Sequence, residues 1–76
     1  MSHVEDIADK LAQDTMKVMA RTGDDQLYEE VAKTIAASST TLEEAYLTAI
    51  RVRLAAVRGR KLLEARLKAI QPGAED

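Results

Sequence analysis

Hydrophobic residues recur every three or four positions across residues 4–19, and this spacing predicts an amphipathic helix. Ser2 and Glu5 form a capping-box pattern at its start, because each side chain can accept a hydrogen bond from the other residue's backbone. Gly23 marks its expected end, since glycine adopts a left-handed backbone without a Cβ clash. The expected inner face of this helix consists of Val4, Ile7, Ala8, Leu11, Thr15, Val18 and Met19.

A second, shorter helix is predicted next, with Asp24 or Asp25 as its N-cap. Its apolar positions keep helical spacing and indicate one inner face. We expect this helix to end in the polar connection at residues 36–40. Its apolar positions are Leu27, Tyr28, Val31, Ala32 and Ile35.

The longest predicted helix opens at residues 41–44, where Thr-Leu-Glu-Glu forms a second capping-box pattern. No strong stop signal occurs before Pro72 and Gly73, so we expect about 30 residues, or roughly 45 Å at about 1.5 Å per residue. Residues 50–54 also alternate apolar and basic side chains, as a strand would. Their flanks carry Ala, Leu and Glu where a strand would need turn residues, and we therefore assign the segment to the helix.

This third helix carries two apolar stripes along its length. The first stripe consists of Ala45, Ala49, Val52, Ala56, Gly59, Leu63, Leu67 and Ile70. The second stripe is confined to the first half and consists of Leu42, Tyr46, Ile50, Leu54 and Val57. A helix that is apolar on two sides needs two neighbours. We therefore expect the first half of the third helix to pack against both shorter helices.

The second half of the third helix has more apolar surface than the chain can cover. Leu62, Leu63, Leu67 and Ile70 lie beyond the reach of the second helix, and the first helix covers at most part of them. Four large aliphatic side chains in water would form an unusual patch on a monomer. We therefore predict an all-α three-helix bundle, with two shorter helices packed on one long C-terminal helix. These four residues are its expected partner-binding face, for a second copy (a homodimer) or for another helical protein.

Length and composition agree with a small helical domain. A chain of 76 residues forms one domain at most, and such chains commonly depend on disulfides, metals or self-association. The sequence contains no cysteine, so disulfides do not contribute. We expect one domain over residues 1–72 and a disordered acidic tail over residues 73–76. The sequence has neither a secretory-signal pattern nor the roughly 20 apolar residues that span a bilayer, and we expect a cytoplasmic protein without membrane contact.

Charge is divided along the chain, although the formal net charge is only −2. Residues 1–44 hold ten acidic and four basic side chains, whereas residues 45–70 hold seven basic side chains and one acidic side chain. One interpretation is that the basic stretch pairs with acidic faces of the first two helices. The alternative is phosphate contact with nucleic acid through Arg51, Arg58, Arg60 and Lys61. The net acidic charge and the lack of interleaved aromatic residues favour internal pairing.

Candidate chemistry is sparse. His3 is the one histidine, and nothing near it in the sequence orients it for catalysis or metal binding. The acidic residues lack the spacing of a calcium loop and the Glu-x-x-His pattern of di-iron bundles. The three glycines are isolated, so no phosphate-binding loop is indicated. We therefore expect a non-enzymatic interaction or regulatory module with no catalytic residues, metal, cofactor or small-molecule substrate; nucleic-acid binding is the alternative function.

Overall fold

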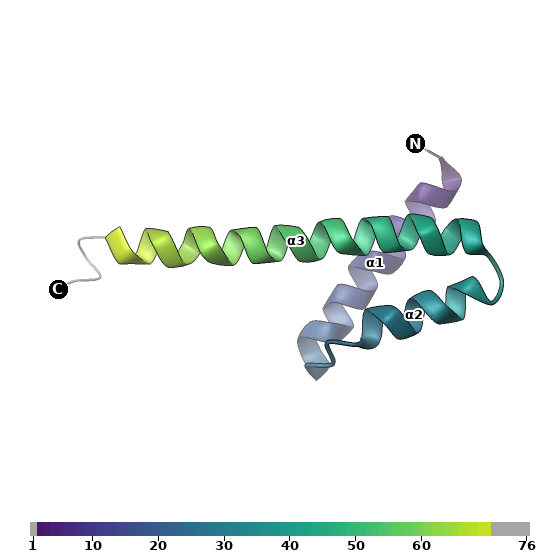
Figure 1. Cartoon of the computed structure of the whole chain (residues 1–76), viewed down its shortest axis with the longest axis horizontal. Coiled ribbons are helices and arrows are strands. Elements are labelled where there is room, and N and C mark those ends of the chain that lie inside the picture. The colour runs from purple at the N-terminus through teal and green to yellow at the C-terminus, as the bar shows by residue number, and fades with distance from the viewer. Residues whose placement is uncertain (1, 71–76) are drawn as a thin grey trace.

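A computed structural model describes residues 2–70, which form three helices joined by two short connections. Helix α1 spans His3–Thr22, α2 spans Leu27–Ala36 and α3 spans Thr40–Ile70. α1 crosses behind the first half of α3, and α2 runs back toward the start of α3 (Figure 1). The long C-terminal helix contacts both shorter helices, which confirms the predicted all-α architecture. The expected stop at residues 72–73 and the acidic tail at residues 73–76 lie outside the described residues.

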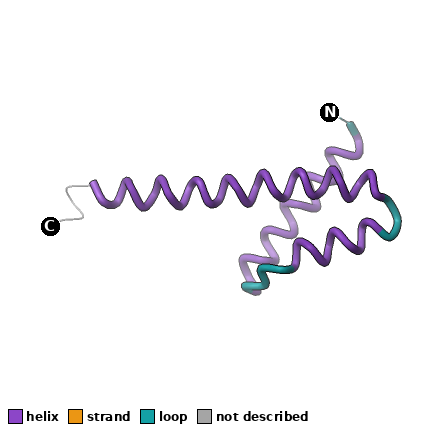
Figure 2. Tube along the Cα trace, in the orientation of Figure 1, coloured by secondary structure: helices purple, strands orange, loops and turns teal. Residues whose placement is uncertain are grey.

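Helix α3 dominates the shape of the molecule. It is 31 residues long, which corresponds to about 46 Å. Residues 50–54 lie within it, and the described chain contains helix and loop but no strand (Figure 2). The second half of α3 projects beyond both shorter helices (Figure 1). The fold is therefore a compact pair of helices packed on one end of a long rod.

Both predicted boundary signals of α1 are confirmed. The Glu5 backbone N–H donates to Ser2 Oγ at 3.1 Å, and the Ser2 backbone N–H donates to Glu5 Oε1 at 3.0 Å. At the other end, Gly23 has φ 73°, and its N–H donates to the Met19 carbonyl at 2.8 Å. A left-handed residue at this position satisfies one of the carbonyl groups that the last helical turn leaves free.

The predicted N-caps of α2 and α3 are wrong. α2 begins after Gln26, whose side chain makes no capping bond; Asp24 Oδ1 instead accepts a hydrogen bond from the Gln26 backbone N–H at 3.0 Å in the preceding turn. α3 begins one residue earlier than its predicted box, because Ser39 Oγ accepts from the Leu42 backbone N–H at 3.1 Å. Thr41 consequently lies inside the first helical turn, where it cannot act as the cap.

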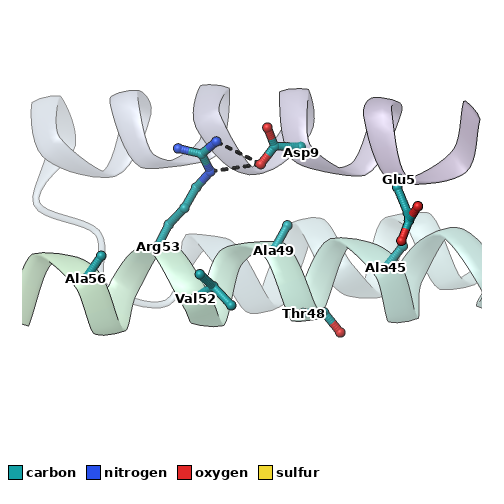
Figure 3. Close-up of a pocket in the computed structure, with 8 residues that line it drawn as sticks. All are labelled: Glu5, Asp9, Ala45, Thr48, Ala49, Val52, Arg53 and Ala56. Atoms are coloured by element: carbon teal, nitrogen blue, oxygen red, sulfur yellow. Dashed lines mark hydrogen bonds and ion pairs between the residues drawn. The ribbon is translucent and has the colours of Figure 1, made fainter. Parts of the chain in front are cut away.

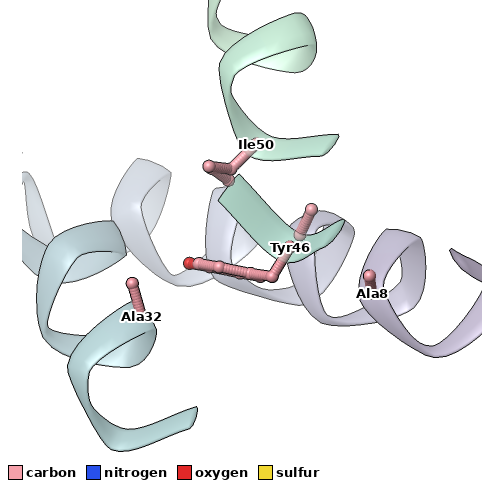
Figure 4. Packing of buried hydrophobic residues seen from close by; sticks show 5 residues of the cluster. Ala8, Ala32, Tyr46 and Ile50 are labelled. Atoms are coloured by element: carbon pink, nitrogen blue, oxygen red, sulfur yellow. The ribbon is translucent and has the colours of Figure 1, made fainter. Parts of the chain in front are cut away.

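The core lies where α1, α2 and the first half of α3 meet. Tyr46 and Ile50 of α3 are fully buried, and they pack against the small side chains of Ala8, Ala12 and Ala32. The ring of Tyr46 reaches between α1 and α2 (Figure 4). Alanine on the two shorter helices lets the helices approach closely, and the large side chains of α3 fill the remaining space.

The buried face of α1 is rotated about the helix axis relative to the predicted face. Ala8, Ala12 and Thr15 are buried, whereas Ile7 and Val18 are exposed. Both arrangements satisfy helical spacing, so the periodicity alone does not distinguish them. The bulk of Tyr46 on α3 favours alanine opposite it, and this size match turns the two larger side chains toward water.

Candidate protein-interaction surface

The second half of α3 has few neighbours: Val57, Arg58 and Lys61 lie beside the end of α1 and the start of α2, and the rest of the helix projects past both (Figure 1). Every residue from 55 to 70 is exposed. The four predicted partner-binding residues keep much of their surface in water: Leu62 is 57% exposed, Leu63 63%, Leu67 52% and Ile70 72%. The sequence prediction that α1 and α2 leave these side chains uncovered is thus met within residues 2–70.

The four residues do not form one face. Successive residues of an α-helix are separated by about 100°, so Leu63, Leu67 and Ile70 lie within one narrow sector. Leu62 lies about 100° from Leu63 and about 80° from Ile70, outside that sector. The structure therefore brings three of the predicted residues together and leaves the fourth beside them.

The two apolar stripes of α3 have different environments in its first half. On the second stripe, Tyr46 and Ile50 are buried, and Leu54 is partly buried. On the first stripe, Val52 is 63% exposed and Ala56 is also exposed. The first half of α3 packs on both shorter helices as expected, and Ala45 and Ala49 of the first stripe are partly buried against the core. From Val52 onward the first stripe lies outside that contact. The first stripe is consequently open to water along most of its length.

An open groove of about 500 Å³ runs between α1 and α3 beside the first stripe. Its floor is formed mainly by small side chains of α3, and its edge on α1 is acidic (Figure 3). The lining residues are Glu5, Asp9, Ala45, Thr48, Ala49, Val52, Arg53 and Ala56. The groove and the first stripe therefore form one continuous surface from Ala45 to Ile70, which we call the α3 seam.

One ion pair fixes α1 against α3 at the edge of this groove. Arg53 Nη2 and Nε donate to Asp9 Oδ1 at 2.7 and 3.1 Å (Figure 3). Gln13 Nε2 donates to Asp9 Oδ2 at 3.0 Å. The hydrogen bond from Arg53, followed by that from Gln13, lowers the pKa of Asp9 below its ordinary value. Asp9 is therefore held ionised, with donors on both oxygens, which suits an anchor better than a proton acceptor.

The other basic residues of α3 are not paired as expected. Among the described residues, Arg53 is the one basic side chain of residues 45–70 that makes an ion pair. The interpretation of general pairing with the acidic faces of α1 and α2 is thus wrong. Arg58 and Lys61 lie beside the end of α1 and the start of α2 without forming an ion pair, and the last part of α3 projects past both shorter helices (Figure 1).

The four candidate nucleic-acid contacts do not share a face. Arg51, Arg58, Arg60 and Lys61 are all exposed. Arg51 and Arg58 are seven residues apart and lie on the same side of α3, whereas Arg60 lies about 200° from Arg58. These side chains thus surround the helix and do not form a single basic ridge.

The described residues contain no other constellation with evident chemistry. His3 is exposed at the first position of α1. Across residues 2–70, no three His, Cys, Asp or Glu side chains lie close enough together to hold a metal ion. None of the three described helices combines the length and the apolar character needed to cross a bilayer.

Comparison of the chain with protein-family models, with curated proteins and with solved structures finds no match. Sequence reasoning identified the late leucines but missed the groove and its ion pair. Asp9 and Arg53 are 44 residues apart in the chain, and only the crossing of α1 over α3 brings them together.

Proposed function

We propose that this protein is a small non-enzymatic interaction module that acts through helix–helix contacts of α3, with a second copy of itself as its partner. The observation that carries the proposal is the run of exposed residues from 55 to 70, which includes four large aliphatic side chains. Patches of this kind on small proteins mark interaction surfaces.

The stability of an unsupported helix favours the same proposal. Isolated helices shorter than about 12–15 residues are marginal in water, because most helical stability in proteins comes from packing an apolar face. Residues 55–70 are only slightly longer, all of them are exposed, and α1 and α2 lie beside only the first few of them. A partner packed along the α3 seam would supply the missing contacts.

The pattern of side chains after residue 57 indicates that this surface is a defined face. The side of α3 that carries the second stripe becomes polar there, with Lys61, Glu64 and Lys68. The side that carries the first stripe stays apolar as far as Ile70. Only the first stripe keeps apolar character where α1 and α2 no longer cover the helix, as expected for a surface that contacts something else.

The expected energy is of the right order for self-association. Complete burial of one Leu or Ile side chain contributes about 1.5–3 kcal/mol. Two copies would bury six large side chains of the seam, Leu63, Leu67 and Ile70 from each copy, which are now 52–72% exposed. Their burial offers roughly 5–11 kcal/mol before costs. Association costs about 4–15 kcal/mol in lost freedom, so the smaller apolar residues of the seam must contribute as well.

The experiment is a pair of matched double variants. Leu63→Glu with Leu67→Glu places two charges on the seam. Ala65→Glu with Ala69→Glu adds the same two charges at the same spacing on exposed positions about 200° away. We expect the first variant to abolish association in size-exclusion chromatography with light scattering and the second to retain it. Unchanged association of the first variant would show that another surface is used.

A second candidate function is nucleic-acid binding through the basic residues of α3. It is favoured by the exposure of Arg51, Arg58, Arg60 and Lys61, none of which forms an ion pair with another described residue. Phosphate contacts strengthen steeply as salt is lowered. A mobility-shift titration with duplex DNA and single-stranded RNA at about 50 mM salt tests this function, and absence of a shift would eliminate it.

A further inference from the structure

We propose that the second copy binds antiparallel, with α3 against α3, so that the large half of one seam lies on the small half of the other. The large half is Leu63, Leu67 and Ile70, and the small half is Ala45, Ala49, Val52 and Ala56. This inference rests on the proposed function, and it adds the orientation, the register and the residues that meet.

The sizes of the side chains along the seam carry the proposal. A two-fold axis between residues 57 and 58 pairs Ala45 with Ile70 of the second copy. The same axis pairs Val52 with Leu63 of the second copy. Ile70 thus meets an alanine, Leu63 meets the smaller valine, and Leu67 meets Thr48, which lines the groove. A parallel pair would place leucine on leucine at one end and alanine on alanine at the other. Uniform spacing of two helices requires their opposing side chains to have complementary sizes.

The spacing of the seam independently fits this register. From Ala45 to Leu63 its residues alternate steps of four and three, which is the heptad spacing of helices that pack along a common seam. In the proposed register Ala56 meets Gly59 of the second copy next to the two-fold axis. These are the two smallest side chains that meet along the seam. Ala49 meets Arg66, whose aliphatic stem can cover the alanine while its guanidinium stays in water.

The groove between α1 and α3 provides room where the large side chains would arrive. It lies beside Ala45, Ala49, Val52 and Ala56, which is the small half of the seam (Figure 3). No comparable wall flanks the large half, since α1 and α2 do not extend that far (Figure 1). The small half of the seam therefore lies in a groove, and the large half projects into solvent. An antiparallel pair places the large half of each copy in the groove of the other copy.

Charge complementarity favours the same orientation. The projecting half of α3 carries Arg58, Arg60, Lys61, Arg66 and Lys68 against the single acid Glu64. A parallel pair would place these two basic segments side by side, where like charges repel. An antiparallel pair separates them and brings each to the α1–α2 end of the other copy. Residues 1–44 there hold ten acidic and four basic side chains, with Glu5 and Asp9 at the edge of the groove.

Disulfide trapping tests the orientation directly, because the chain contains no cysteine of its own. Val52→Cys and Leu63→Cys are prepared as separate single variants, mixed in their reduced form to allow exchange, and then oxidised mildly. Both positions are exposed in the single chain, so the substitutions leave the core intact. Val52→Cys mixed with Ala65→Cys serves as the control, since Ala65 lies about 200° from Leu63 around α3 and so points away from the seam.

The antiparallel register predicts a covalent dimer in the Val52→Cys and Leu63→Cys mixture, at least about tenfold more than in either variant alone or in the control. Within one variant the two thiols would lie about 16 Å apart along the seam, whereas a disulfide requires Cα atoms within about 7 Å. Efficient trapping of either variant with itself would indicate a parallel pair and overturn the inference while the proposed function stands. If sedimentation detects a dimer but the mixture gives no trapping above the control, the register is wrong. If sedimentation detects no dimer, the inference and the proposed self-association both fail.

Discussion

Arg53 of α3 donates two hydrogen bonds to the same carboxylate oxygen of Asp9 on α1, with Nη2 at 2.7 Å and Nε at 3.1 Å. Within residues 2–70 this is the one ion pair that joins two helices. It lies at the edge of the groove and holds α1 to one side of the first stripe (Figure 3).

The ion pair predicts a specific acid dependence of stability. The Arg53 hydrogen bond lowers the pKa of Asp9 in the folded protein below 3.8, so the pair stabilises the fold above that pH. This contribution is lost as the pH falls through the folded-state pKa, because the carboxylate then takes up a proton. We expect Asp9→Asn to lower the urea midpoint at pH 7, with the difference from wild type shrinking as the pH falls from about 5 to about 2.

Asp14→Asn is the matched control for this measurement. Asp14 accepts from Lys10 Nζ at 3.4 Å on the exposed side of α1, and exposed pairs of this kind contribute little. Its urea midpoint should stay close to that of the wild type at every pH. An Asp9→Asn difference that is equally large at both ends of the pH range would contradict the account of the Arg53 pair.

Tyr46 is expected to contribute mainly through its ring. Its one hydroxyl proton faces two acceptors, the Tyr28 carbonyl at 3.2 Å and Thr15 Oγ1 at 3.3 Å, and both distances are long for such bonds. Tyr46→Phe should therefore cost about 0.5–1.5 kcal/mol of unfolding free energy. Tyr46→Ala removes the ring from the centre of the core and should cost about 3–5 kcal/mol. Urea unfolding followed by circular dichroism measures both, and equal losses would contradict the assigned role of the ring.

The N-cap of α3 gives a local test. Ser39 Oγ accepts the Leu42 backbone N–H, so Ser39→Ala should cost about 1 kcal/mol of unfolding free energy. Thr41 is exposed within the first turn, and Thr41→Ala should change the stability by less than about 0.5 kcal/mol. Thermal unfolding of the two variants distinguishes them, and a larger loss at Thr41 would restore the capping box that the sequence pattern suggested.

Gly59→Ala is expected to stabilise the protein, unlike the substitutions above. Gly59 lies in the interior of α3, and a Cβ added there meets nothing within 4 Å in the single chain. Gly59→Ala should therefore stabilise α3 by about 0.5–1 kcal/mol, because alanine loses less backbone freedom than glycine on forming a helix. Far-ultraviolet circular dichroism at a dilution where the chain is monomeric should give a larger helical signal. A smaller signal would contradict the straight, uninterrupted α3.

Local signals in the sequence were sufficient for some features of the fold. The three helices, the Ser2–Glu5 capping box and the Gly23 end depend on residues within a few positions of one another, and all three predictions are confirmed. The caps of α2 and α3 were misassigned because several residues with suitable side chains adjoin each start. Ser39, Thr40 and Thr41 are all plausible N-caps from composition alone. The choice depends on where the connection from α2 lets the helix begin.

The surface required information that no local pattern holds. Exposure of the late leucines followed from length, since α1 and α2 are too short to cover them. Burial of Ala12 in place of Ile7 and Val18 depends on the ring of Tyr46, which arrives from another helix. The groove likewise depends on both shorter helices packing along the second stripe. Such contacts are decided by the relative sizes of side chains far apart in the chain.

Sedimentation velocity of the wild-type protein, from about 1 to about 300 μM, tests most directly whether a second copy covers the α3 seam. If a second copy covers the seam, the sedimentation coefficient shifts with rising concentration to that of a species of twice the 8.3 kDa chain mass. A single species of 8.3 kDa at every concentration would contradict the proposed self-association.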